Sequence, residues 1–190
     1  MNLPNFLTII RMALVPVFIV FFYIGQGGQQ IYFVLAFAVF IIASATDAVD
    51  GHIARKRNLI TNFGKLMDPL ADKVLTTAAF IVFVDAHIIP AWMVIVILAR
   101  EFIITGLRGV AASEGVIIAA GLSGKLKTIF QMVAIGIILL GLAIGNSPAE
   151  DSLRLFVSNA GLVCLWIAVA LTIYSGIEYL WKGRKLLSAK

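Results

Sequence analysis

Six long apolar segments, separated by short polar breaks, run through almost the whole sequence. Each comes close to the roughly 20 residues that an α-helix needs to cross the hydrocarbon core of a bilayer. Only 13% of the residues are charged, whereas a soluble domain carries about a quarter. We therefore predict a single all-α integral membrane domain over residues 1–190, with six transmembrane helices over Phe6–Tyr23, Ile31–Ile53, Leu70–Ala86, Ile88–Val110, Ile129–Ile144 and Leu155–Trp181.

Basic residues are distributed unequally between the two sides of this arrangement. The breaks after the second and fourth segments and the C-terminal tail contain Arg55, Lys56, Arg57, Lys65, Arg108, Lys125, Lys127, Lys182, Arg184, Lys185 and Lys190, whereas the opposite breaks contain only Arg154. Because short basic loops stay in the cytoplasm, we predict a multi-pass protein of the cell (cytoplasmic) membrane, with both termini and the polar stretch from Asp47 to Asp72 facing the cytoplasm. The net charge of +5 follows from this bias and from contact with anionic membrane lipids, so no nucleic-acid binding is predicted.

Four aspartates lie within or beside the apolar segments. Asp47 and Asp50 belong to the second segment, and Asp68 and Asp72 flank the start of the third. A carboxylate at the centre of a membrane helix costs roughly 2.5 to 3.5 kcal/mol, so four of them require a compensating cation. Oxygen ligands without histidine or cysteine favour Mg²⁺ or Mn²⁺ over zinc. These four aspartates are therefore predicted to bind a divalent metal.

Helical spacing allows the four carboxylates to meet. At 100° per residue, Asp50 lies about 60° from Asp47 around the helix, while Asp68 and Asp72 share one face. Gly51, which lies near the line of Asp47, would let a ligand or another backbone approach closely. Two helices can thus direct all four side chains into one cavity.

Two separate ion pairs, made with Arg55 and Lys73, are the alternative explanation for these charges. Such pairs would not require glycines at the observed spacings, however. Gly64, ahead of the second aspartate pair, would leave backbone amides free for phosphate oxygens if a helix begins there. The spacing therefore favours a site for a metal and a phosphate-bearing ligand.

The complete pattern resembles a known family. The string D-x2-D-G-x2-A-R-x8-G-x3-D-x3-D is filled by Asp47, Asp50, Gly51, Ala54, Arg55, Gly64, Asp68 and Asp72. All of these positions match the signature of the CDP-alcohol phosphatidyltransferases. The resemblance implies a six-helix membrane enzyme, usually a homodimer, in which an alcohol attacks the lipid-linked phosphate of a CDP-activated lipid and CMP is released.

Flanking segments narrow the reaction that the resemblance implies. Family members that use CDP-diacylglycerol and sn-glycerol 3-phosphate have segments similar to Asn2–Arg11, Ala99–Phe102, Gly106–Arg108 and Gly124–Thr128. The implied product is phosphatidylglycerophosphate, in phosphatidylglycerol and cardiolipin biosynthesis. The alternative is a sister enzyme that makes cardiolipin or that uses inositol phosphate or serine as the acceptor.

The resemblance also assigns roles to residues. Asp47, Asp50, Asp68 and Asp72 would hold the metal, and Asp72 would be the general base that takes the proton of the attacking hydroxyl. The CDP part would be held by Asn5, Thr8, Gly51, Arg55 and Gly64.

The phosphate of glycerol 3-phosphate requires cations beyond the metal. Arg100 and Arg108 lie about 80° apart on one predicted helix, and Lys125 begins the next segment from the same side of the membrane. We predict that these three bind the acceptor phosphate. Pairing with Glu101 is the alternative for Arg100, because an unpaired guanidinium in apolar surroundings is expensive. The aromatic residues near segment ends, Tyr179 among them, are interpreted as membrane-interface anchors.

A divalent-cation transporter is the remaining alternative from another class, since carboxylates inside membranes also mark ion pathways. A pathway needs polar residues through the whole bilayer. Here the acidic cluster is confined to the predicted cytoplasmic side, and the opposite halves of the segments are almost wholly apolar. The sequence therefore favours an enzyme.

Overall fold

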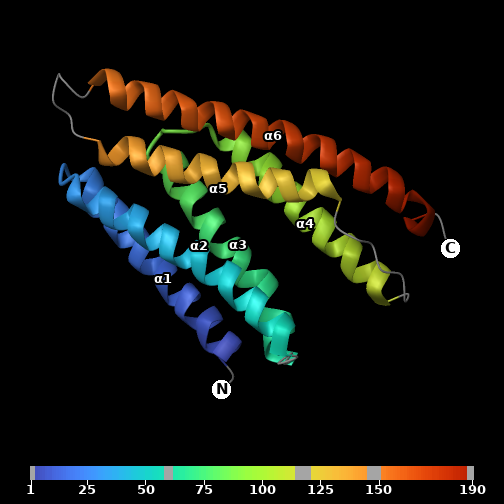
Figure 1. Cartoon of the computed structure of the whole chain (residues 1–190). Coiled ribbons are helices and arrows are strands. Elements are labelled where there is room, and N and C mark those ends of the chain that lie inside the picture. The colour runs from blue at the N-terminus through green and yellow to red at the C-terminus, as the bar shows by residue number, and fades with distance from the viewer. Residues whose placement is uncertain (1–2, 58–61, 114–120, 145–150, 188–190) are drawn as a thin grey trace.

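A computed structural model describes the backbone of residues 3–57, 62–113, 121–144 and 151–187, and the side chains of residues 6, 8–46, 71, 73–113, 121–144 and 151–181. Within this part, the chain is all helical (Figure 1). The helices are α1 (Leu3–Gln26), α2 (Ile31–Arg57), α3 (Asn62–Asp85), α4 (Ala91–Ser113), α5 (Leu122–Ala143) and α6 (Asp151–Leu187). The predicted all-α fold is confirmed.

Several helices extend past the predicted apolar segments. α3 begins at Asn62 rather than Leu70, and α5 begins at Leu122 rather than Ile129. The difference arises because backbone hydrogen bonding continues through polar residues, whereas an apolar segment marks only the part suited to hydrocarbon. α4 begins three residues later than predicted, at Ala91, because His87 has a φ of 56° and the chain reverses before Pro90.

Three stretches of the described helices are long and apolar enough to cross a membrane, namely Thr8–Gln26, Leu122–Ala143 and Asp151–Trp181. Their length and composition identify this chain as a membrane protein. A shorter apolar stretch, Ile31–Thr46, covers the first part of α2. α3 and α4 carry charged residues within their length, including Lys73, Arg100 and Glu101. These three residues line a cavity between the helices.

The helices form a bundle, and the helix ends lie at its two opposite ends. α1 packs against α2 and α3, α5 packs against α6, and α2–α5 and α4–α6 contacts join these groups. Figure 1 shows the start of α1, the end of α2, the start of α3, the end of α4 and the end of α6 toward one end of the bundle. The ends of α1, α3 and α5 and the starts of α2, α4 and α6 lie toward the opposite end. The aspartate-bearing parts of α2 and α3 therefore lie toward the same end of the bundle as the start of α1 and the end of α6.

Glycines allow α5 and α6 to pack closely. A Cβ atom at Gly161 would lie 2.8 Å from Cγ1 and 3.2 Å from the backbone nitrogen of Ile138. A Cβ atom at Gly141 would lie 2.8 Å from Oγ of Ser158. Small residues permit this kind of approach between membrane helices.

Candidate functional site

The four predicted metal ligands lie on consecutive helices. Asp47 and Asp50 belong to α2, and Asp68 and Asp72 belong to α3. Their side chains lie outside the described residues, as do those of the predicted CDP-binding residues Asn5, Gly51, Arg55 and Gly64. Among the side chains that are described, no three potential metal ligands come together. The metal site and its ligands thus stay a prediction.

Thr8 is the one predicted CDP-binding residue whose side chain is described. It is buried, and so is Arg11, one turn further along α1. A buried guanidinium is strongly unfavourable unless charged or hydrogen-bonding groups surround it. Thr8 and Arg11 therefore face the interior of the helix bundle rather than the lipid.

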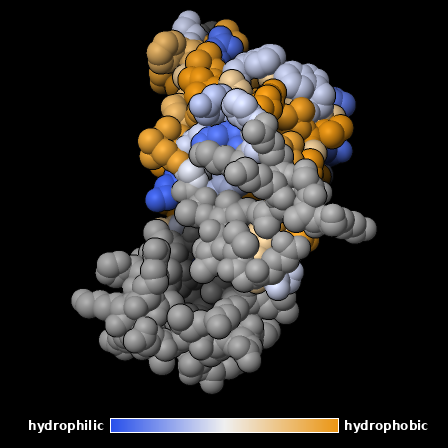
Figure 2. All heavy atoms as spheres, turned by 90° about the vertical axis from the view of Figure 1, so that its right-hand side faces the viewer, coloured by the Kyte–Doolittle hydropathy of each residue, from blue (hydrophilic) through white to orange (hydrophobic). Residues whose placement is uncertain are grey.

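A cavity of about 690 Å³ lies between α3, α4, α5 and α6. We call it the cationic cavity because basic side chains dominate its lining. Figure 2 views the molecule from the right-hand side of Figure 1 and shows hydrophilic side chains between apolar ones in the described part of this face. The charged lining residues are Lys73, Arg100, Glu101, Arg108, Lys125 and Lys127. Five basic groups around one carboxylate favour an anionic ligand, and guanidinium groups suit the oxygens of a phosphate.

Glu101 is the centre of an ion-pair network on one wall of this cavity. It pairs with Lys127 of α5, and its carboxylate lies 3.4 Å from Nζ of Lys73 in α3 and 3.8 Å from Nη1 of Arg100. Lys127 is buried, so its ammonium needs the carboxylate as a counter-charge. Lys73 also donates a hydrogen bond to Thr105. The network links three helices and connects the residue directly after Asp72 to the cavity.

Tyr179 lies close to both arginines of the cationic cavity. Its hydroxyl accepts hydrogen bonds from Nη2 of Arg108, at 2.6 Å, and from the backbone N–H of Gly121, at 3.0 Å. The guanidinium carbons of Arg100 and Arg108 lie 5.6 Å and 5.3 Å from the centre of its ring, within the range of cation–π attraction. Tyr179 is 4% exposed, so its interpretation as a membrane-interface anchor is wrong.

The burial of Tyr179 has a signal in the sequence. Thr172, Ser175 and Tyr179 follow an i, i+3, i+7 spacing, which places them on one face of α6. All three are buried. A polar stripe along an otherwise apolar helix indicates a face that packs against protein rather than lipid.

The three predicted acceptor-phosphate residues line the same cavity. Arg100 and Arg108 extend from α4, and Lys125 extends from the first turn of α5. The Nε groups of Arg100 and Arg108 are buried and have no hydrogen-bond partner among the described residues. Buried donors of this kind are expensive unless a ligand or water satisfies them. Their contribution to substrate binding stays a prediction, but their convergence is observed.

The fold and the cationic cavity define a class: a helical membrane protein with a site suited to a phosphate-bearing ligand. Residues 1–174 match the family described as CDP-alcohol phosphatidyltransferase. The chain belongs to this family, which confirms the family predicted from the aspartate spacing.

Three relatives illustrate the similarity. The CDP-diacylglycerol--glycerol-3-phosphate 3-phosphatidyltransferase of Bacillus subtilis (strain 168) is 44% identical, over 98% of this chain and 97% of its own. The protein of the same name from Rickettsia bellii (strain RML369-C) is 40% identical, over 94% and 93%. A probable phosphatidylglycerophosphate synthase of Mycobacterium tuberculosis (strain ATCC 25618 / H37Rv) is 38% identical, over 94% and 79%.

Proposed function

We propose that this protein transfers the phosphatidyl group of CDP-diacylglycerol to sn-glycerol 3-phosphate, giving phosphatidylglycerophosphate and CMP. The names of relatives that are 40 to 44% identical support this reaction. The structural observation that carries it is the cationic cavity. An acceptor that is itself a phosphate needs a separate cationic site, whereas serine does not.

Asp47, Asp50, Asp68 and Asp72 would hold Mg²⁺ or Mn²⁺. Four carboxylates on two consecutive helices are a donor set that suits a hard divalent ion. When bound, such an ion supplies neutralisation of the diphosphate charge and stabilisation of the departing phosphate.

The transfer itself exchanges one phosphorus–oxygen bond for another. The acceptor hydroxyl gives its proton to the carboxylate of Asp72 while its oxygen bonds to the phosphorus of the phosphatidyl group. The bond between that phosphorus and the oxygen of CMP breaks, and CMP leaves with the electron pair. The CDP part would be bound by Asn5, Thr8, Gly51, Arg55 and Gly64.

The acceptor phosphate would bind Arg100, Arg108 and Lys125 in the cationic cavity. Lys73, which lines this cavity, directly follows Asp72 in α3. This proximity would bring the acceptor hydroxyl toward the base while the phosphate is held at the arginines. Positioning of this kind is a large part of catalysis when the bound geometry approaches that of attack.

In the membrane, we propose six spans with both termini and the catalytic site on the cytoplasmic side of the cell membrane. The basic residues around the cationic cavity support this orientation. The homodimer implied by the family resemblance belongs to the same proposal.

The test is a comparison of acceptors with purified protein, CDP-diacylglycerol and Mg²⁺. Glycerol 3-phosphate, plain glycerol, inositol phosphate, serine and phosphatidylglycerol would be supplied separately, and CMP release and the lipid product would be measured. Among these acceptors, we expect fast turnover only with glycerol 3-phosphate. Equal or faster turnover with another acceptor would assign the protein to a sister activity.

Arg108→Lys tests the acceptor site separately. Lysine keeps the charge but cannot present the planar fork of guanidinium donors to phosphate oxygens. The apparent KM for glycerol 3-phosphate should rise about tenfold, in line with a loss of about 1.4 kcal/mol, while the KM for CDP-diacylglycerol changes little. An equal rise in both KM values would contradict this assignment.

A further inference from the structure

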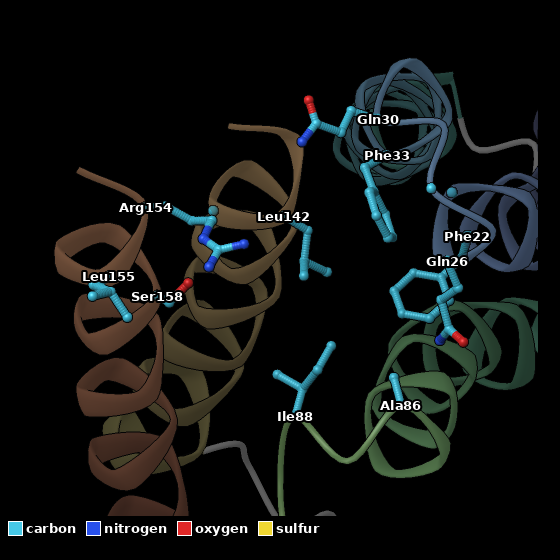
Figure 3. A pocket seen from close by; sticks show the side chains of 13 residues that line it. Phe22, Gln26, Gln30, Phe33, Ala86, Ile88, Leu142, Arg154, Leu155 and Ser158 are labelled. Carbon is cyan, nitrogen blue, oxygen red and sulfur yellow. The ribbon is translucent and has the colours of Figure 1, made fainter. Parts of the chain in front are cut away.

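A second cavity, of about 490 Å³, lies at the end of the bundle opposite the termini. Its lining residues come from around the α1–α2 turn, the α3–α4 turn, the end of α5 and the beginning of α6. Figure 3 shows Phe22, Gln26 and Phe33 on one side and Arg154 and Ser158 on the other, with Ile88 between them.

The ends of the apolar spans place this cavity at the depth of lipid headgroups. Gln26 is the last residue of the span in α1, Leu142 is next to the end of the span in α5, and Arg154 belongs to the first turn of the span in α6. Three spans therefore end at the cavity wall. The hydrocarbon core of a bilayer stops where such spans stop, so the cavity lies among the headgroups of the leaflet opposite the termini.

The lining combines one cation with hydrogen-bonding and apolar groups. Arg154 supplies a guanidinium, Gln26 and Gln30 supply amides, and Ser158 supplies a hydroxyl. The apolar wall includes Phe22, Phe33, Ile88, Leu142 and Leu155. No acidic side chain is among the described lining residues. The charge of the lining therefore favours a phosphate group without a balancing amine.

Close packing of α5 and α6 places the cation at this wall. A Cβ atom at Gly141 would lie 2.8 Å from Oγ of Ser158 and 3.4 Å from its backbone nitrogen, so a side chain here would displace the Ser158 hydroxyl. Arg154 lies one turn before Ser158 on the same face of α6. Gly141, Arg154 and Ser158 all line the cavity.

The acidic residues near this cavity do not prevent a phosphate from binding Arg154. Oδ1 of Asp151 lies 3.5 Å from Nη2 of Arg154, and both side chains are substantially exposed, at 50% and 38%. An exposed pair of this kind contributes little, so a phosphate can replace it. Asp85, at the same end, accepts a hydrogen bond from the Tyr23 hydroxyl at 2.9 Å.

We propose that this cavity binds the headgroup of an anionic phospholipid from the leaflet opposite the catalytic site. The phosphate lies against Arg154, the amides and the Ser158 hydroxyl bind headgroup and ester oxygens, and Phe22, Phe33 and Leu142 contact the glycerol and the first carbons of the acyl chains. A zwitterionic lipid binds less well, because no described lining residue is acidic and able to bind its amine. This inference is independent of the proposed reaction.

The test uses purified full-length protein in detergent micelles, with the midpoint of thermal unfolding as the readout. Phosphatidylglycerol or phosphatidylcholine would be added to wild type, Arg154→Gln and Asp151→Asn. Phosphatidylglycerol should raise the wild-type midpoint by about 2 to 4 °C more than phosphatidylcholine. Arg154→Gln should remove this difference, whereas Asp151→Asn, which removes the competing carboxylate, should enlarge it.

The opposite signs for the two variants separate lipid binding from a structural ion pair. If the pair only stabilises the helix, both substitutions lower the midpoint and neither changes the response to lipid, which would overturn the proposal. An undiminished lipid response in Arg154→Gln would do so as well. Glycerophosphoglycerol, the soluble headgroup, serves as a further probe: an equal response to it would show a site for aqueous anions rather than for lipid.

Discussion

Tyr179 connects three helices through one side chain. It extends from α6, accepts a hydrogen bond from Arg108 of α4 and another from the N–H of Gly121 at the start of α5. Its ring also faces Arg100. Both guanidinium groups lie within the range of cation–π attraction to this one ring, which holds them near each other. If the two arginines bind the acceptor phosphate as proposed, Tyr179 would orient them toward it.

Two substitutions of Tyr179 separate its hydroxyl from its ring. Tyr179→Phe removes the hydrogen bond to Arg108 and keeps the stacking surface, so the KM for glycerol 3-phosphate should rise about three- to tenfold. Tyr179→Leu removes both interactions and should raise it further. Steady-state kinetics with each substrate varied in turn would measure both KM values. The KM for CDP-diacylglycerol should change little. A larger defect in Phe than in Leu would contradict the orienting role of the ring.

The metal prediction is tested at Asp68. Asp68→Asn should lower turnover by more than about 100-fold, because even residues behind metal ligands contribute 10- to 100-fold. EDTA should abolish the activity of the wild-type enzyme until Mg²⁺ or Mn²⁺ is restored. Asp85→Asn is the matched control: Asp85 lies at the far end of the bundle, bound to Tyr23, and its loss should leave turnover near wild type. Full wild-type activity in EDTA would refute the metal site.

At the scale of helices, the cationic cavity takes four of its six charged residues from α3 and α4 and the other two, Lys125 and Lys127, from the span in α5. The described spans in α1, α5 and α6 are apolar, whereas α3 and α4 carry Lys73, Arg100, Glu101 and Arg108 into the cationic cavity. Hydrophobic segments of the right length predicted where helices occur, because the bilayer demands about 20 apolar residues. They could not predict where helices end, because polar residues continue α3 and α5 beyond the apolar part.

The packing of α5 on α6 gives a prediction for single glycines. Gly161→Ala places a methyl group 2.8 Å from Cγ1 of Ile138 and 3.2 Å from its backbone nitrogen, so the backbones must move apart. Overpacking typically costs about 1 to 3 kcal/mol. Gly136→Ala is the control, because the nearest atom to its Cβ is in the ring of Phe37, at 3.8 Å. Thermal unfolding in detergent should show a lower midpoint for Gly161→Ala than for wild type. The midpoint of Gly136→Ala should be unchanged.

At the scale of the whole molecule, the parts of the site differed in how far they could be predicted. The aspartate string lies within one connected stretch of sequence, so its spacing could be recognised directly. The contacts of Glu101 with Lys73 and Lys127 join three helices, and Tyr179 is far from Arg108 in sequence. Contacts of that kind depend on tertiary packing, which residue spacing along one helix does not encode.

The whole molecule also has two chemically different ends. The cationic cavity lies toward the end with the termini, and the cavity around Arg154 lies at the other. Basic residues are retained on the cytoplasmic side during insertion. This asymmetry predicts one orientation, in which Ser113 at the end of α4 is cytoplasmic and Ser152 at the start of α6 is external.

Cysteine labelling tests that orientation. Cys164 is the single cysteine of the chain, so a Cys164→Ala background accepts one new thiol at a time, and Ser113 and Ser152 are both exposed. A membrane-impermeant maleimide applied to intact cells should label Ser152→Cys, whereas Ser113→Cys should react only after the membrane is opened. The reverse pattern would place the cationic cavity on the outer side, away from cytoplasmic glycerol 3-phosphate, and would contradict both the orientation and the proposed reaction.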